Sequence, residues 1–175
     1  DFFFSMQETS GENKGMVHHK MHDFKWTALC VRPAEDPLER IVKPVTYAAS
    51  LQAAAAWAQS ARLWEPYDAA YATKCLDAAK LAYSAAKAKY EANGSKYNSA
   101  DTYFAPIEDG KGGGAYGDNY VDDDFYWAAC ELYLSTGDES YYKDLSGYKD
   151  AFKCGTVLEG GEDKGTNACF TWGTT

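Results

Sequence analysis

Two alanine-rich segments separated by one proline constrain the fold more than any other feature of this chain. The first segment carries apolar side chains at helical spacing: Ala48, Leu51, Ala55 and Ala58. Because alanine has the highest intrinsic helix propensity, residues 44–64 are predicted to form a helix. Pro66 lacks a backbone N–H and would end that helix, so a second helix is expected after a short turn.

The second segment has signals for both ends of a helix. Asp68 offers a side-chain acceptor to the free amides of a first turn, and Asn93-Gly94 supplies a stop. Between these signals, apolar residues line two sides of a helix that runs to about Tyr90: Tyr71, Cys75, Ala78 and Ala82 on one side, and Leu76, Ala79, Tyr83 and Ala86 on the other. A helix with two apolar sides is buried on both, as in a layered bundle.

The C-terminal half favours two further helices. Residues 121–136 end at Gly137, and Asp138 is expected to cap a helix from Glu139 to about Phe152. Residues 94–120 would form a long connection rich in glycine, aspartate and aromatic residues, and connections of this length in compact domains are usually functional or disordered. The predicted class is all-α, with paired helices joined alternately by short turns and long loops.

The remaining segments add little regular structure. Residues 1–7 are typical of the end of a helix, and residues 17–20 and 29–31 are expected to be short extended segments. The chain starts in the middle of a pattern and ends at Trp172-Gly173-Thr174-Thr175 without an end signal. We therefore expect a piece of a longer polypeptide, for which the lack of a signal peptide says nothing about secretion.

Composition excludes some functional classes and leaves others open. The formal net charge of −9 argues against a nucleic-acid partner, because a phosphate backbone requires positive charge. No apolar run approaches the length of a membrane span. Aromatic residues make up 15% of the chain, which fits either a surface that stacks on sugar rings or an aromatic-rich core.

Five cysteines are widely spaced, and no two form a CxxC pair, so a zinc ribbon is not expected. Cys154 and Cys169 flank a glycine-rich stretch and could form a disulfide if the protein is secreted. Buried free thiols are an equal alternative.

Acidic residues gather where the long connection meets the third helix. Asp118, Asp122, Asp123 and Asp124 lie within seven residues, and Gly112 to Gly114 precede them. Calcium prefers such oxygen ligands, but the spacing does not match an EF-hand. From spacing alone, capping and interaction with the helix dipole are the favoured interpretation.

Three further candidate sites occur in the sequence. His18 and His22 could hold a metal if they lay on a helix, although Gly15 and Val17 weaken that interpretation. Trp26 lies near basic residues and is either a ligand contact or a core tryptophan covered by lysine side chains. Trp172 could be a stacking platform beside a glycine-rich stretch.

Five blocks of sequence follow one another along the chain in an order that is characteristic of a known family. They are residues 1–20, 44–50, 58–76, 112–136, and Phe170-Thr171-Trp172-Gly173. The fourth block contains the glycine run followed by Phe125-Tyr126-Trp127-Ala128-Ala129. Together these blocks resemble glycoside hydrolase family 9, the inverting cellulases and related β-glucanases.

The resemblance implies an (α/α)₆ barrel of paired helices, of which residues 1–175 would be one internal part. Members of the family hydrolyse β-1,4-glucan with inversion, using one carboxylate as base and one carboxylic acid as acid. The family's base lies in an Asp-Ala-Gly-Asp motif upstream of these blocks, and its acid is a glutamate near the end of the domain. Neither motif occurs in this sequence, so no catalytic residue is assigned in it.

Some members bind a structural calcium at an Asp-Glu pair entering the corresponding helix. Asp123 and Asp124 stand at that place, and Asn119 and Tyr120 could add oxygens from the preceding loop. Trp172 matches a position that stacks on glucose in some members. Trp26 lies near a region where other members place substrate aromatics, although its local motif differs.

The expected function is that of part of a secreted, extracellular endo-β-1,4-glucanase that acts on cellulose, with catalytic carboxylates outside this segment. Cellulose-binding or docking modules are possible elsewhere in the longer polypeptide. A non-catalytic carbohydrate-binding or scaffold protein is the alternative, and a different glycosidase or polysaccharide lyase on an (α/α) toroid is a third.

Overall fold

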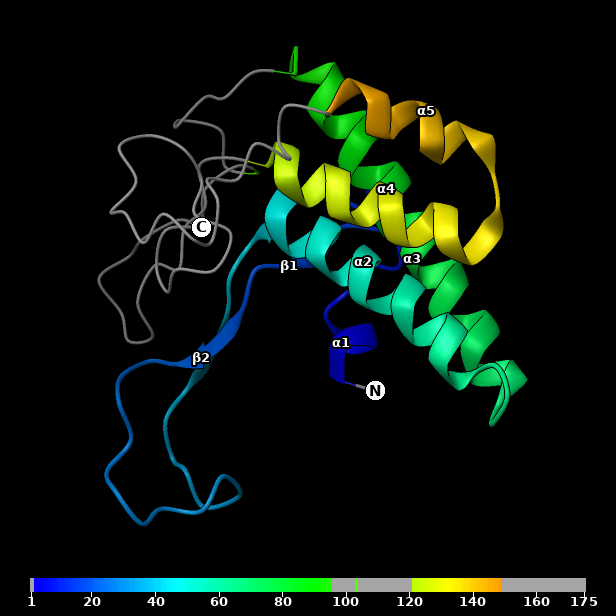
Figure 1. Cartoon of the computed structure of the whole chain (residues 1–175). Helices are drawn as coiled ribbons and strands as arrows, with labels where there is room; N and C mark the ends of the chain where they lie inside the picture. The colour runs from blue at the N-terminus through cyan, green and yellow to red at the C-terminus, as the bar shows by residue number, and fades with distance from the viewer. Residues whose placement is uncertain (1, 96–102, 104–120, 149–175) are drawn as a thin grey trace, which may run out of the picture.

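The computed structural model describes residues 2–95, 103 and 121–148, which are mostly helical (Figure 1). In chain order the elements are α1 (Phe2–Ser5), β1 (Val17–His18), β2 (Met21–Asp23), β3 (Arg40–Val42), β4 (Val45–Thr46), α2 (Tyr47–Trp64), α3 (Ala69–Ala92), α4 (Asp122–Thr136) and α5 (Glu139–Gly147). Helices α2, α3 and α4 pack against one another, and α5 packs along α4. We call α2 to α5 the helical layer.

Helices α2 and α3 form where the alanine-rich segments predict them, apart from one boundary. Helix α2 begins at Tyr47, with Thr46 as its N-cap accepting from the Ala49 amide at 3.2 Å, and not at Pro44 as predicted. The prediction was wrong by three residues because Val45 and Thr46 pair with β1. Helix α3 begins after Asp68, whose side chain accepts from the Tyr71 amide, and this confirms the predicted cap.

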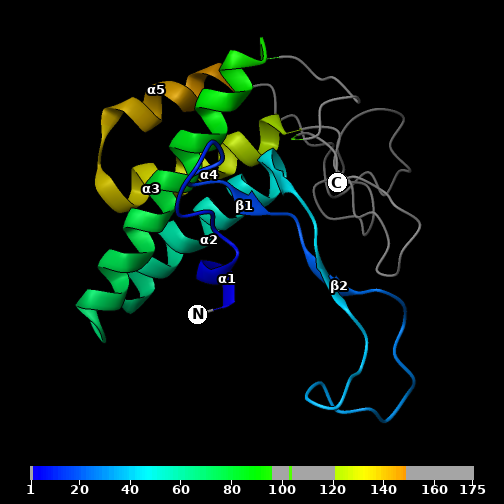
Figure 2. The ribbon, with the colours of Figure 1, turned by 180° about the vertical axis from the view of Figure 1, so that it is seen from behind.

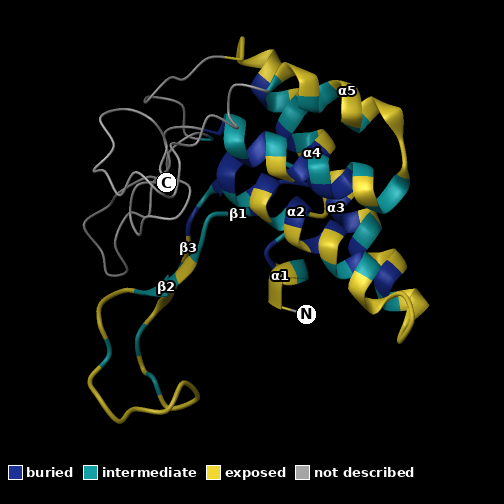
Figure 3. Cartoon of the chain, viewed as in Figure 1, coloured by how far each residue is buried: buried dark blue, intermediate teal, exposed yellow. Residues whose placement is uncertain are grey.

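Small side chains allow α2 and α3 to approach closely. Both helices carry alanines without exposed surface: Ala54, Ala55 and Ala58 on α2, and Ala79, Ala82 and Ala86 on α3. Larger residues of α2, α3 and α4 surround them, so the buried positions face one another between the helices (Figure 3). The predicted burial of α3 on two sides is confirmed.

The C-terminal helices begin and end at the predicted residues, with one exception. Gly137 ends α4 in the left-handed conformation (φ 67°), and Asp138 caps α5 by accepting from the Ser140 amide. Helix α5 ends at Gly147, so the predicted extension to about Phe152 was wrong. Glycine has low helix propensity, and the Tyr148 amide already turns back to the Leu145 carbonyl oxygen.

A two-stranded arm projects from the helical layer (Figures 1 and 2). Strands β1 and β4 pair antiparallel at its base, β2 and β3 pair antiparallel farther out, and we call residues 19–42 the arm. The predicted extended segment at residues 17–20 is confirmed for β1. The one at residues 29–31 was wrong, because these residues lie in the loop beyond β2 and β3, where Cys30 adopts a turn conformation (φ 68°).

The loop at residues 8–16 is fixed against α3. Gly15 has a φ of 93°, and a Cβ at this position would lie 2.9 Å from the Leu81 carbonyl oxygen, so only glycine fits. The Gln7 side chain donates to the Ala78 carbonyl oxygen at 3.1 Å. Within the described residues, no helix combines the length and the apolar character needed to cross a lipid bilayer.

Candidate functional site

Helices α2 and α4 run in the same direction (Figure 1), and hydrogen bonds join them toward their C-terminal ends. Arg62, near the end of α2, donates to the Glu131 carbonyl oxygen at 2.9 Å and pairs with the Glu131 carboxylate. Ser135 of α4 donates to the Ala58 carbonyl oxygen at 2.8 Å. Helix α3 runs the opposite way, because only the short turn at residues 65–68 separates it from α2.

Aromatic contacts define the other end of these helices. Tyr47, at the start of α2, lies 5.3 Å from Tyr90, near the end of α3, and Tyr90 lies 5.1 Å from Phe125 in the first turn of α4, as measured between ring centroids. The arm and both termini of the α3–α4 connection join the helices here. We call this the loop-bearing end; the short turns at residues 65–68 and 137–138 lie at the opposite end.

Helix α4 begins at the loop-bearing end with three carboxylates, Asp122, Asp123 and Asp124. Asp124 keeps only 7% of its surface exposed, and Oδ1 of Asp123 and Oδ2 of Asp124 are shielded from solvent. Like charges repel strongly when water is excluded, so this arrangement favours nearby positive charge. The positive end of the α4 dipole supplies part of it.

Capping does not explain the acidic start of α4. The N-cap position is Val121, which makes no side-chain hydrogen bond to the helix, and the three carboxylates all lie in the first turn beyond it. The sequence spacing predicted both capping and an interaction with the helix dipole. The predicted capping was therefore wrong, while the position of the carboxylates in the first turn agrees with the dipole interaction. Carboxylate oxygens placed in this way are also suitable calcium ligands.

The described residues hold only part of any such ion site. They contain no group of three or more histidine, cysteine, aspartate or glutamate side chains arranged to hold a metal. Asp123 and Asp124 could contribute oxygens, while the other expected ligands, Asn119 and Tyr120, lie outside the described residues, as does Trp172. Asp118, Cys154 and Cys169 lie outside them too.

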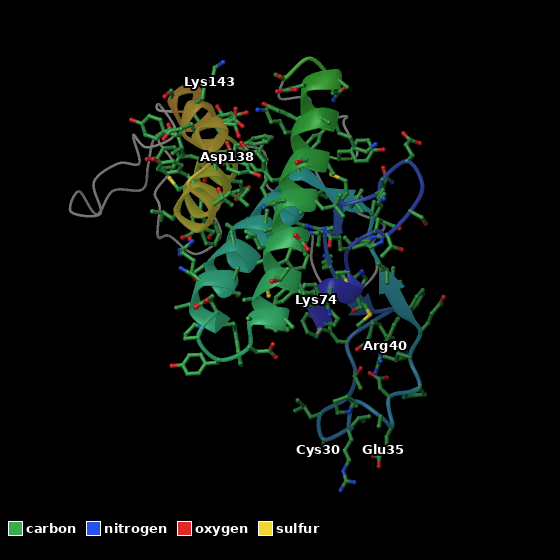
Figure 4. All side chains as sticks on the ribbon, turned by 90° about the vertical axis from the view of Figure 1, so that its right-hand side faces the viewer. Cys30, Glu35, Arg40, Lys74, Asp138 and Lys143 are labelled. Carbon is green, nitrogen blue, oxygen red and sulfur yellow. The ribbon has the colours of Figure 1, made fainter. Side chains whose placement is uncertain are left out.

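Trp26 is a surface residue of the arm. It lies in the loop between β2 and β3 with 83% of its surface exposed, so the alternative of a core tryptophan was wrong. Thr27 beside it donates to the Asp36 carboxylate at 2.5 Å, which ties the two sides of that loop together. Cys30 and Glu35 mark the tip of the same loop, which projects away from Lys74 and Asp138 of the helical layer (Figure 4).

Among the residues that the structure describes, the histidines belong to no group of side chains that could hold a metal. His18 lies in β1, with Nδ1 2.8 Å from the Lys43 carbonyl oxygen and Nε2 3.0 Å from Glu8 Oε1. His22 lies in β2 and not on the helix that a metal pair would require, and its Nδ1 is 2.8 Å from the Asp23 carbonyl oxygen. Both side chains stabilise the arm and its base.

Sequence reasoning did not identify two polar clusters that hold the helical layer together. Arg62, Glu131 and Ser135 join α2 to α4. Asp144 of α5 accepts from the Tyr83 hydroxyl at 2.8 Å and from Lys87 Nζ at 2.6 Å, both on α3. Burial, followed by the hydrogen bond to Asp144, raises the pKa of Tyr83. The sequence signal that could have revealed these clusters is a charged residue inside an apolar stripe, such as Glu131.

Comparisons with curated proteins give the chain a clear set of relatives. The profile described as "Glycosyl hydrolase family 9" matches residues 1–175. A cellulose 1,4-beta-cellobiosidase of Acetivibrio thermocellus is 45% identical over all of this chain and 20% of its own length. Endoglucanase C of Cellulomonas fimi is 44% identical over 81% of this chain and 12% of its own length. The chain therefore spans about a fifth or less of these two relatives.

Solved structures agree with this assignment. A thermostable endoglucanase from Alicyclobacillus acidocaldarius superposes with a TM-score of 0.70 at 29% identity, over 85% of this chain and 26% of its own. A metagenome-derived family 9 endoglucanase gives 0.67 at 34% identity, over 85% and 24%. This chain therefore matches such (α/α)₆-barrel structures over about a quarter of their chains. This chain belongs to glycosyl hydrolase family 9, of whose enzymes it forms a partial segment.

Proposed function

We propose that residues 1–175 are part of the catalytic domain of a secreted endo-β-1,4-glucanase that hydrolyses cellulose with inversion. One observation carries the proposal: the family profile covers the whole chain, whose relatives include a cellobiosidase and an endoglucanase at 45% and 44% identity. The catalytic carboxylates lie outside this segment. Its helices form part of the barrel, and the loop-bearing end lies toward the substrate.

The division of labour in an inverting glycosidase explains why this segment is not expected to act alone. One carboxylate activates a water molecule while a carboxylic acid on the other side of the bond protonates the leaving oxygen. Asp123 and Asp124 are too close together in sequence to stand on opposite sides of a sugar ring. They are better suited to bracing the chain that enters α4.

Calcium is the proposed partner of those two carboxylates. Calcium takes six to eight oxygen ligands and would neutralise the charge gathered at the start of α4. Asp123 and Asp124 would contribute carboxylate oxygens, and Asn119 and Tyr120 are the proposed further ligands. The support is the shielding of carboxylate oxygens beside a third aspartate, Asp122.

Aromatic side chains are the proposed glucan contacts. Pyranose rings present flat apolar faces that stack on tryptophan. The proposal assigns this role to Trp172 and, on the arm, to Trp26, whose exposure leaves its indole accessible. Cellulose-binding or docking modules elsewhere in the polypeptide would supplement these contacts.

The test uses the full polypeptide that contains residues 1–175, here called the parent protein. We expect it to release reducing sugar from soluble carboxymethyl cellulose and to lower the viscosity of the solution early, because internal cleavage shortens chains quickly. Slow viscosity loss with early cellobiose release would support a cellobiosidase and exclude endo action. The isolated segment is the matched control, and turnover by it would overturn the placement of the catalytic groups.

A further inference from the structure

The end of helix α3 carries a motif that the proposed function does not use. Asn93 is the C-cap of α3, and Gly94 and Ser95 follow it, all three exposed at the loop-bearing end. Asn93-Gly94 is the one Asn-Gly pair in the sequence. Such a pair is chemically reactive, because the glycine amide nitrogen has no Cβ beside it to hinder its approach to the asparagine side chain.

Two hydrogen bonds close the turn that follows α3. The Gly94 amide donates to the Glu91 carbonyl oxygen at 2.9 Å, and the Ser95 amide donates to the Tyr90 carbonyl oxygen at 2.9 Å. Gly94 has a φ of 81°. This pattern is a Schellman motif, in which a glycine in the left-handed region allows the last carbonyl oxygens of a helix to be satisfied.

The closed turn keeps the two reactive groups apart. At the Asn93 ψ of 10°, the Gly94 nitrogen is turned away from the Asn93 side chain, so attack requires rotation about ψ. That rotation breaks the hydrogen bond to Glu91. Within the part of the chain that the structure describes, nothing beyond the neighbouring residues lies within 4 Å of where a Gly94 Cβ would stand. Exposed helix ends open at little cost in free energy, so the turn can open into solvent.

We propose that Asn93 is a site of spontaneous deamidation, at a rate that the turn after α3 controls. The Gly94 nitrogen forms a bond to Cγ of Asn93 as the Cγ–Nδ2 bond breaks, and ammonia leaves with the Gly94 amide proton. The product is a cyclic succinimide. Water then opens the succinimide at either carbonyl carbon, which gives aspartate or isoaspartate. In isoaspartate the main chain runs through the side-chain carbon atoms.

Either product weakens the end of α3. Aspartate places a negative charge at the C-terminal end of a helix, where the helix dipole is also negative. Isoaspartate adds a carbon atom to the main chain and moves the Ser95 amide away from the Tyr90 carbonyl oxygen. The Tyr90 ring lies 5.3 Å from the Tyr47 ring and 5.1 Å from the Phe125 ring, so a loosened turn affects the starts of α2 and α4.

The first test incubates the folded parent protein at mildly alkaline pH, which favours loss of the Gly94 amide proton. Mass spectrometry of the peptide containing residue 93 should show conversion of amide to acid, with both isoaspartate and aspartate as products. Asn13 is an internal control and should convert at least roughly tenfold more slowly, because the Cβ of Lys14 crowds the attacking nitrogen. Asn93→Gln should abolish the reaction, since it would require a larger ring. Aspartate as the sole product would indicate direct hydrolysis and overturn the role of Gly94.

Two variants at Ser95 test whether the turn controls the rate. Ser95→Pro removes the amide that donates to Tyr90, so it should open the turn and accelerate conversion at Asn93 roughly fivefold, the factor for losing one hydrogen bond. Ser95→Ala keeps the amide and is the matched control, with an unchanged rate. Equal rates in the two variants would overturn the control by the turn.

A comparison of fresh and aged protein tests the structural consequence. Protection from amide exchange at Ser95 should fall roughly two- to fivefold once Asn93 has become aspartate, and further with isoaspartate. No conversion in either the wild type or Ser95→Pro would overturn the proposal. An oligosaccharide on Asn93 would also overturn it, because Asn93-Gly94-Ser95 matches the acceptor motif for N-glycosylation and the sugar would block the leaving nitrogen. None of these measurements uses glucan hydrolysis, so the proposal is decided independently of the proposed function.

Discussion

The helical layer and the arm are built on opposite principles, although the arm leads directly into α2. In the layer, leucine side chains such as Leu51 and Leu132 have no exposed surface, whereas in the arm Leu29 exposes 94% of its surface and Trp26 83%. Burying such a side chain contributes about 1.5–3 kcal/mol, which the arm forgoes within the described residues. The layer is therefore the part that stabilises the segment.

The largest expected contrast comes from removing matched leucines. Leu51→Ala in the parent protein should lower the free energy of unfolding by about 3 kcal/mol, because it leaves a cavity between α2 and its neighbours. Leu29→Ala should cost less than about 0.5 kcal/mol, since its side chain is already in water. Denaturant unfolding of both variants measures the difference. Equal costs would show that the arm tip is buried in the parent protein.

Calcium should stabilise the layer and leave the arm unaffected. At a concentration about 100 times its dissociation constant, calcium would add about 2.7 kcal/mol through binding at the start of α4. Thermal unfolding of the parent protein with Asp123→Ala and Asp124→Ala should lose this gain, while remaining similar to the wild type in chelator. Asp36→Ala, on the arm, is the control and should retain the gain. An equal loss with and without calcium would leave only the helix-dipole role.

Two arginines offer a matched test of ion pairs in the two regions. Arg62 is about two-thirds buried and pairs with Glu131, whose side chain is 11% exposed, so Arg62→Met should cost about 2 kcal/mol after allowance for solvent screening. Arg40 of the arm lies 3.9 Å from Asp23 and is half exposed, so Arg40→Met should cost under about 0.5 kcal/mol. Urea unfolding measures both, and a costlier Arg40→Met would reverse the ranking of the regions.

The smallest expected effect is the loss of local stability at low pH. The Ser140 amide bonded to its carboxylate holds the pKa of Asp138 below its usual value, and the Thr27 hydroxyl does the same for Asp36. A lowered folded pKa gives stability that is complete above the unfolded value of about 4 and is lost as pH falls through the folded pKa. The protection factors for amide exchange, which correct for the slower intrinsic exchange in acid, should therefore fall at Ser140 in the layer and at Leu38 in the arm.

Asparagine variants at these two aspartates assign the acid effect to each region. Asp138→Asn should flatten the acid dependence at Ser140 only, and Asp36→Asn that at Leu38 only, because the two carboxylates bond different amides. A change at both amides from either variant would show that the layer and the arm open together.

The same contrast explains how much could be predicted from sequence. The helices of the layer are specified by local signals, and Asp68, Gly137 and Asp138 each acts as predicted. The strands of the arm are three residues long and exist only through partners such as His22 and Ile41, far apart in the chain. No local pattern predicts that pairing, and the extended segment predicted at residues 29–31 lies instead in the loop beyond the strands.

Part of the candidate site could also be predicted from the sequence, and part could not. The acidic start of α4 is visible in the sequence as consecutive aspartates, and the structure places it at the loop-bearing end. The contacts of Tyr103 cannot be read from the sequence, because its partners Tyr47, Asn13 and Lys89 come from three distant segments. Contacts of this kind depend on the packed fold and not on residue spacing.

The anomeric configuration of the first product tests the central claim most directly. The parent protein would be mixed with a soluble cello-oligosaccharide, and the newly formed reducing ends would be followed by proton NMR before mutarotation. Inverting hydrolysis of a β-1,4 bond predicts that the α-anomer appears first. Initial release of the β-anomer, or no hydrolysis at all, would contradict the account.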